Sequence, residues 1–157
     1  MKKLVTQRRM RGISMVEALV ALVILSVGML GVAGLYLSSL QAGRSANLRI
    51  QAVNLATDLS DRIRANRRGV ANYKASATDT GKANDCATVT CTSVQIAEND
   101  LYIWKQGITA ALPANANGSV TYTAGTPDVT PFRCVILVTW REAGADADST
   151  YSLTVEV

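Results

Sequence analysis

Residues 18–37 read ALVALVILSVGMLGVAGLYL, a run of twenty residues without a formal charge. The uncharged stretch continues through Gly43 and ends at Arg44. About 20 apolar residues at roughly 1.5 Å each cross a hydrocarbon core of about 30 Å, so the run predicts a membrane-spanning helix. Only 18% of the 157 residues are charged, against about 25% in an average soluble domain. This low charge agrees with a membrane segment.

The residues before the run are cationic, and they are Lys2, Lys3, Arg8, Arg9 and Arg11. Cations mark the cytoplasmic end of a membrane helix, so we expect everything after the run to lie outside the cytoplasm. A secretory signal peptide would have a shorter apolar region, of about 7–15 residues, and then a cleavage site. A plain single-pass anchor leaves a carboxylate at the head of the run unexplained, because such a group is costly within lipid.

That carboxylate is Glu17, and it belongs to a longer pattern. The segment Arg11-Gly12-Ile13-Ser14-Met15-Val16-Glu17, followed by the apolar run, resembles the class III signal sequence of type IV prepilins. The resemblance implies that prepilin peptidase removes residues 1–12 by cutting between Gly12 and Ile13. It also implies N-methylation of Ile13 and a Glu at the fifth mature position, which is Glu17. Ile13 departs from the Phe that the family most often has first after the cut.

The charges at the start of the mature helix suggest how subunits would pair. Cleavage would create a charged amine at Ile13, one helical turn from Glu17. In a bundle of such helices, the amine of one subunit and the carboxylate of its neighbour can neutralise each other. The pair would then set the register between subunits, even where a buried ion pair adds no net stability.

The helix pattern continues beyond the membrane run. Apolar residues recur at spacings of three or four, which predicts one buried helix face; they are Leu48, Ala52, Leu55, Leu59 and Ile63. We expect this helix to end near Asn66–Gly69, and residues 69–96 to form a loop. A second amphipathic helix is predicted over residues 97–112, and strands over residues 119–123, 132–141 and 150–157.

These elements predict an α+β fold in which a long N-terminal helix packs on a small antiparallel sheet, as in pilins. The expected organisation is a cleaved leader over residues 1–12, a membrane or filament-core helix over 13–43, and a periplasmic globular head over 44–157. Three cysteines allow one disulfide. We favour Cys86–Cys91, which closes a small ring in the polar loop, and a Cys91–Cys134 bridge is the main competitor.

Catalytic, metal and cofactor sites are not indicated. The chain has no histidine, which excludes His-based triads and His-ligated metals. Asp146 and Asp148 are too few for a calcium site, which needs six to eight oxygen ligands. A cluster of arginines could bind nucleic acid or an acidic partner, but we favour simple stabilisation of the C-terminus of the first helix, because no aromatic residues interleave it; the cluster is Arg62, Arg64, Arg67 and Arg68.

The head resembles a narrower group, the PilV-type minor pilins. The similar segments are Cys86-x4-Cys91, Asp100-Leu101-Tyr102-Ile103-Trp104, and Leu112-Pro113 with the strand that follows. The resemblance implies a minor pilin that joins other minor pilins and the major pilin in a pilus tip or initiation complex, through the inner-membrane assembly platform. The expected location is the inner membrane and then the pilus surface, in support of pilus biogenesis, twitching motility or adhesion. A minor pseudopilin of a type II secretion system has the same signature and is the alternative.

Overall fold

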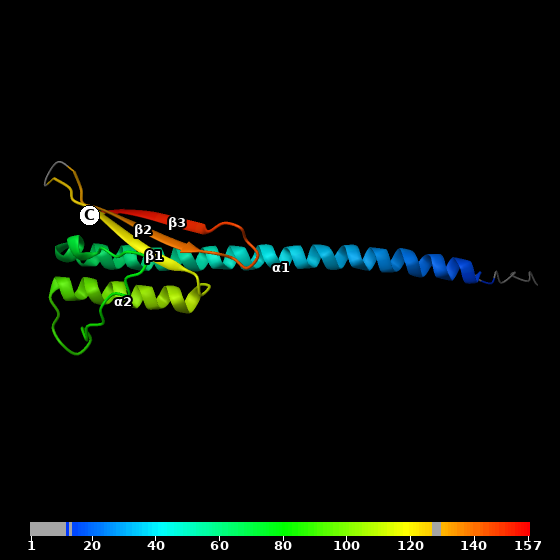
Figure 1. The fold of residues 1–157 in the computed structure, drawn as a ribbon, viewed down its shortest axis with the longest axis horizontal. Helices are drawn as coiled ribbons and strands as arrows, with labels where there is room; N and C mark the ends of the chain where they lie inside the picture. The colour runs from blue at the N-terminus through cyan, green and yellow to red at the C-terminus, as the bar shows by residue number, and fades with distance from the viewer. Residues whose placement is uncertain (1–11, 13, 127–129) are drawn as a thin grey trace, which may run out of the picture. The chain divides into compact units, whose positions relative to one another are not determined.

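The computed structural model describes residues 12, 14–126 and 130–157 (Figure 1). A long helix comes first and a three-stranded sheet last, with two shorter helices between them. The elements are α1 (Met15–Ala65), the 3-10 helix η1 (Arg67–Asn72), α2 (Ser93–Ala111), β1 (Asn117–Thr123), β2 (Arg133–Trp140) and β3 (Ser149–Glu156). The predicted α+β class, with a long helix packed on a small antiparallel sheet, is confirmed.

The chain divides into two units, Met1–Gly43 and Arg44–Val157. In the first unit, α1 runs from Met15 to Gly43 without a break, and all the described residues from 14 to 43 are exposed. The helix is long and apolar enough to cross a membrane. Most of the predicted leader (residues 1–11) and the predicted methylation position, Ile13, lie outside the described residues.

The second unit is a head with one hydrophobic core. The predicted stripe of α1 supplies part of it: Ala52, Leu59 and Ile63 are buried, and Leu48 and Leu55 pack against them at the margin. The helix α2 supplies a second face, with Leu101, Trp104, Ile108 and Leu112 buried as its periodicity predicts. Two amphipathic helices therefore cover one face of the sheet.

The helix α2 begins four residues before the predicted start at residue 97. Thr92 caps it: the Thr92 hydroxyl accepts a hydrogen bond from the Gln95 amide, and the Gln95 side chain accepts one from the Thr92 amide. This reciprocal capping box satisfies two donors that a helix end leaves free, so the helix extends into a polar segment. The segment predicted as a loop from residue 69 likewise begins with η1.

The sheet is an antiparallel meander with the order β1-β2-β3. Alternate residues of the central strand point into the core and are buried; these are Cys134, Ile136, Val138 and Trp140. The first strand approaches α2 closely at Gly118, where a Cβ atom would collide with the side chains of Trp104 and Ile108. Gly118 therefore allows the sheet to lie directly on α2.

Candidate functional site

The predicted processing and assembly residues lie at the start of α1. Gly12 is exposed and precedes the helix, and Glu17 is exposed in its first turn. Negative charge is favourable there, because the first turn carries free backbone N–H groups and the positive end of the helix dipole. Ile13, whose amine we expect to pair with Glu17 of a neighbour, lies outside the described residues.

The apolar side chains that follow Glu17 have no cover in the isolated chain. Large apolar residues from Met15 to Leu40 are 53% to 87% exposed, whereas those of the head core are at most 7% exposed. Exposed apolar surface on this scale is typical of a membrane or protein interface. The chain by itself therefore leaves this segment without cover.

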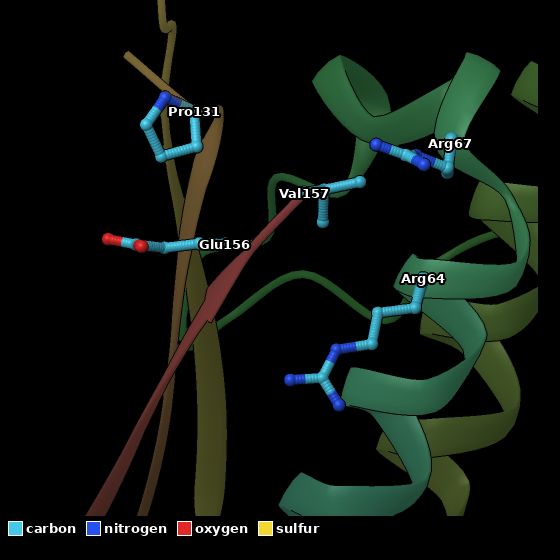
Figure 2. Close-up of a pocket in the computed structure, with 5 residues that line it drawn as sticks. All are labelled: Arg64, Arg67, Pro131, Glu156 and Val157. Atoms are coloured by element: carbon cyan, nitrogen blue, oxygen red, sulfur yellow. The ribbon is translucent and has the colours of Figure 1, made fainter.

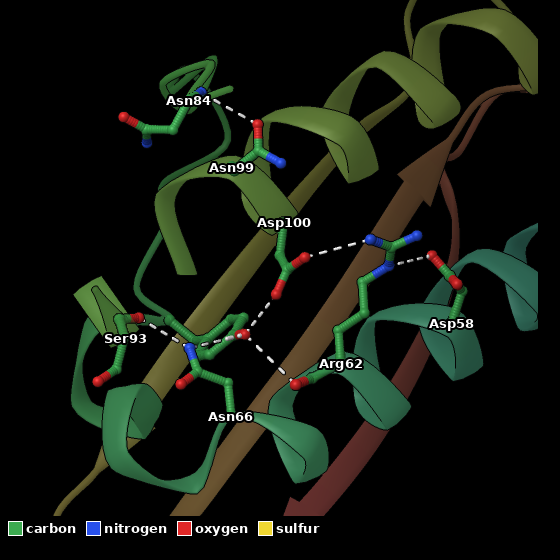
Figure 3. A network of polar contacts seen from close by, with 8 residues as sticks. Asp58, Arg62, Asn66, Asn84, Ser93, Asn99 and Asp100 are labelled. Atoms are coloured by element: carbon green, nitrogen blue, oxygen red, sulfur yellow. Dashed lines mark hydrogen bonds and ion pairs between the residues drawn. The ribbon is translucent and has the colours of Figure 1, made fainter. Parts of the chain in front are cut away.

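The polar loop before α2 contains the predicted disulfide. Cys86 is bonded to Cys91, with Cα atoms 5.4 Å apart, so the favoured pairing is confirmed and the Cys91–Cys134 alternative is not formed. Cys134 is a free, buried thiol, and burial raises its pKa. A hydrogen bond joins the loop to α2: the backbone N–H of Asn84 donates to Oδ1 of Asn99 at 3.0 Å (Figure 3).

A polar network that the sequence analysis did not predict joins α1 to α2 through Asn66 and Tyr73, the residues on either side of η1 (Figure 3). Asp100 on α2 is 8% exposed, and its two oxygens accept hydrogen bonds from Arg62 Nη1 at 3.1 Å and from the Tyr73 hydroxyl at 2.5 Å. Asn66, just after α1, donates from Nδ2 to the carbonyl of Ser93 at 2.8 Å. Burial and the hydrogen bond to Asp100 raise the pKa of Tyr73. These contacts fix the end of α1 against the start of α2.

A second buried polar group, Lys105, was also missed because it lies next to Trp104 on the apolar face of α2. Its Nζ atom donates to the carbonyl oxygens of Gly118 at 2.6 Å, Ser76 at 2.7 Å and Ala77 at 3.3 Å. Burial lowers the pKa of this amine. The three carbonyls satisfy all three N–H donors of the ammonium group, so Lys105 joins the loop, α2 and β1.

The arginine cluster separates into two parts. Arg62 is held by Asp58 at 2.9 Å and by Asp100, which makes it structural. Arg64 and Arg67 instead line an open cleft of about 390 Å³ with Pro131, Glu156 and Val157. Figure 2 shows the two arginine side chains on one side of the cleft and Pro131 and Glu156 on the other, with the Glu156 carboxylate pointing away from the arginines. Arg64 makes an exposed ion pair with Asp61 at 3.7 Å, whereas Arg67 has no ion-pair partner within the described residues, so Arg67 presents positive charge to the cleft.

Among the described residues, no group of three or more His, Cys, Asp or Glu side chains could hold a metal ion. Asp148 makes an exposed ion pair with Arg141 at 2.6 Å.

Two family models match the chain. One, described as a prokaryotic N-terminal methylation motif, covers residues 7–33, which include Gly12, Ile13 and Glu17. The other, described as type IV pilin Tt1218, covers residues 34–102, from the middle of α1 into α2. Together the two matches support a type IV pilin. No curated protein and no solved structure matches the chain.

The methylation motif implies processing by prepilin peptidase and assembly with other pilins, and together with the apolar helix it fits anchoring in the inner membrane. The type IV pilin family is structural rather than enzymatic. The strands of the head lie beyond residue 102 and outside both matches.

Proposed function

We propose that this pilin is a minor pilin, similar to PilV, which joins other minor pilins in the tip or initiation complex of a type IV pilus. One observation carries the proposal: a folded head follows a helix segment whose described residues, 14–43, are all exposed and largely apolar. Such a segment is stable first in lipid and then among the helices of a filament. The proposed organisation is a leader over residues 1–12, this helix over 13–43, and a periplasmic head over 44–157.

The membrane orientation follows from the same proposal. Cations before the apolar run keep the N-terminus in the cytoplasm, and the head is then periplasmic. The Cys86–Cys91 disulfide supports this placement, because disulfides persist in the oxidising periplasm and are rare in the cytosol.

Assembly would use the two groups at the start of the mature chain. Cleavage after Gly12 frees the amine of Ile13, and Glu17 lies one helical turn further on. An acid on an apolar helix is tolerated in lipid where it is paired, so the Ile13 amine of a neighbouring subunit is the proposed partner of Glu17. This pairing would set the axial register of the pilin in the complex.

The processing step gives the first test of the proposal. Gly12→Val places a branched side chain beside the scissile bond, so prepilin peptidase should not cut. The full-length protein should remain in the inner membrane, twelve residues longer by mass spectrometry, and the variant should not reach pili. Ser14→Val, two residues beyond the cut, is the control and should be processed. Cleavage of the Gly12→Val variant at the same bond would contradict the assignment.

A second measurement tests the minor role. The pilin should be present in purified pili at a small fraction of the major pilin, and it should co-purify from membranes with other minor pilins. Deletion of the gene should reduce surface pili and leave protein secretion intact. Normal piliation with loss of a type II secretion substrate from the medium would instead identify a minor pseudopilin, which has the same signature.

A further inference from the structure

The two edges of the sheet differ, and the difference starts with the pairing of β3. Phe132 and Val157 exchange two backbone hydrogen bonds, at 3.0 and 3.3 Å. In an antiparallel pair such exchanges recur at every second residue. In this register the backbone N–H and C=O groups of the odd-numbered residues of β3 point toward β2, and those of the even-numbered residues point to the outer edge of the sheet. The outward backbone N–H and C=O groups are those of Thr150, Ser152, Thr154 and Glu156.

The opposite edge, on β1, is closed by the head itself. Val120 exchanges two backbone hydrogen bonds with Ala75, at 2.8 and 3.1 Å. The Gly118 carbonyl accepts from Lys105 at 2.6 Å. In the described part of the chain, β3 has β2 as its single sheet neighbour, and no element lies along its outer side (Figure 1).

The free edge lacks the features that usually block strand addition. Its pairing with β2 runs through eight consecutive residue pairs without a bulge, and β3 contains no proline or lysine. The one charged residue, Glu156, is held by Arg133 at 2.8 Å. On the face toward the helices, Tyr151 and Leu153 are half-buried, whereas Ile136 of the central strand is fully buried. Another strand would complete their burial.

We propose that the free edge of β3 accepts an extended strand of a different pilin subunit, which continues the sheet and presents a carboxylate to Arg64 and Arg67. The outward row of backbone groups fits only an extended chain, because donors and acceptors alternate at the spacing of a strand. The cleft with the two arginines lies at the Glu156 end of this edge. This inference rests on the proposed function, since it names the surface by which the pilin joins its complex.

A second copy of this chain does not fit the edge. Two β3 strands paired antiparallel are related by a two-fold axis perpendicular to the sheet. That axis reverses every direction parallel to the sheet, and therefore also the direction of the part of α1 that packs on the sheet. The Arg44 ends of the two copies, where the apolar segments attach, would then point in opposite directions, which two subunits anchored in one membrane cannot do. Head-to-tail pairing with β1 is also blocked, because Ala75 occupies that edge.

The test is photo-crosslinking of the full-length pilin in producing cells, with benzoylphenylalanine in place of Ser152. We expect a crosslinked product whose second chain is a different pilin, identified by mass spectrometry, with the link in a segment that forms a strand. Thr154→Pro in the same protein removes one outward N–H and should lower the yield about tenfold. Thr154→Val keeps that N–H and is the matched control, with an unchanged yield. Melting of the detergent-solubilised variants verifies that both heads fold.

Charge reversal tests the second half of the proposal. Arg64→Glu combined with Arg67→Glu should lower the crosslink yield about tenfold, whereas Arg68→Glu, outside the cleft lining, should leave it unchanged. The edge proposal is overturned by a crosslink to a second copy, by no crosslink to a pilin, or by a folded Thr154→Pro protein with full yield. If other minor pilins still co-purify in those cases, the proposed function stands and only the docking edge is wrong.

Discussion

The Nη1 atom of Arg62 lies 3.1 Å from Oδ1 of Asp100, and this ion pair joins α1 to α2 across 38 positions of the sequence. Arg62 also contacts Asp58 at 2.9 Å, one turn earlier on its own helix. The Asp100 side chain is 12% exposed and that of Asp58 is 52% exposed. One guanidinium group therefore pairs with a buried and an exposed carboxylate, so the contributions of the two ion pairs to stability can be compared directly.

Removal of the buried carboxylate should cost far more than removal of the exposed one. Asp100→Ala leaves the Tyr73 hydroxyl with only the Arg62 carbonyl, at 3.4 Å, as acceptor and leaves Arg62 half-paired, so we expect a loss of about 2–3 kcal/mol in the free energy of unfolding. Asp58→Ala should cost below about 1 kcal/mol, because an exposed ion pair contributes little. Denaturant unfolding of the two variants measures both values, and equal losses would contradict this account.

The raised pKa of Tyr73 predicts a loss of stability in alkali. The unfolded chain releases this proton near pH 10, whereas the folded head retains it to higher pH. Above about pH 10 the unfolded state thus binds fewer protons than the folded state, and the free energy of unfolding should fall by up to about 1.4 kcal/mol per pH unit from this group. Tyr73→Phe should remove this part of the slope. An unchanged slope in thermal or denaturant unfolding at pH 10–11 would exclude Tyr73 as its source.

The buried ammonium group of Lys105 should be essential for the loop that closes the β1 edge. Lys105→Met keeps the apolar stem but leaves the Gly118 carbonyl without its donor and the Ser76 carbonyl with only the Asp79 backbone N–H, at 3.3 Å, so we expect destabilisation by about 2–4 kcal/mol. Lys82→Met is the matched control, because the Lys82 side chain is 71% exposed. Chemical denaturation should leave the control within about 0.5 kcal/mol of the parent protein. A loss of similar size in both variants would mean that the carbonyl contacts are unimportant.

The Cys86–Cys91 bond should stabilise the loop before α2. A chain-entropy estimate for so short a ring is about 2 kcal/mol, which the double variant Cys86→Ser, Cys91→Ser should lose. Limited proteolysis should then cut within residues 73–92 before any other part of the head. Reductant should produce the same change in the parent protein and none in the variant. Non-reducing peptide mapping that found Cys134 in a disulfide would refute this pairing.

Glu17→Val should separate membrane insertion from assembly. The substitution removes a costly carboxylate from the apolar helix, so insertion should persist, and cleavage after Gly12 should persist as well. Docking should fail, because the amine of the neighbouring subunit then lacks its partner in an apolar setting. Surface pilus abundance and recovery of partner pilins are the measurements, with the length of the mature chain as the control. Normal values for both would leave Glu17 without a role in assembly.

Local patterns in the sequence predicted most of the elements. The long apolar run and the cations before it predicted a membrane helix. The apolar stripe of α1 and the alternating pattern of β2 repeat over several turns or residues, so they indicate which face of each element is buried. The disulfide pairing was also predicted correctly, because Cys86 and Cys91 are close neighbours in one loop. The early start of α2 was missed although Thr92 and Gln95 carry a local signal, the capping box.

Only the tertiary structure decided which polar groups meet. Asp100 finds Arg62 and Tyr73, and Lys105 finds Gly118, through contacts between segments far apart in the chain. Such contacts leave no period in the sequence, since each depends on how the sheet and two helices pack. The same holds for the sheet edges: Ala75 pairs with β1, whereas among the described residues β3 pairs only with β2. The sequence by itself determined that the N-terminal helix carries a long apolar segment, and the packing of the head decided which edge of the sheet has a second neighbour among the described residues.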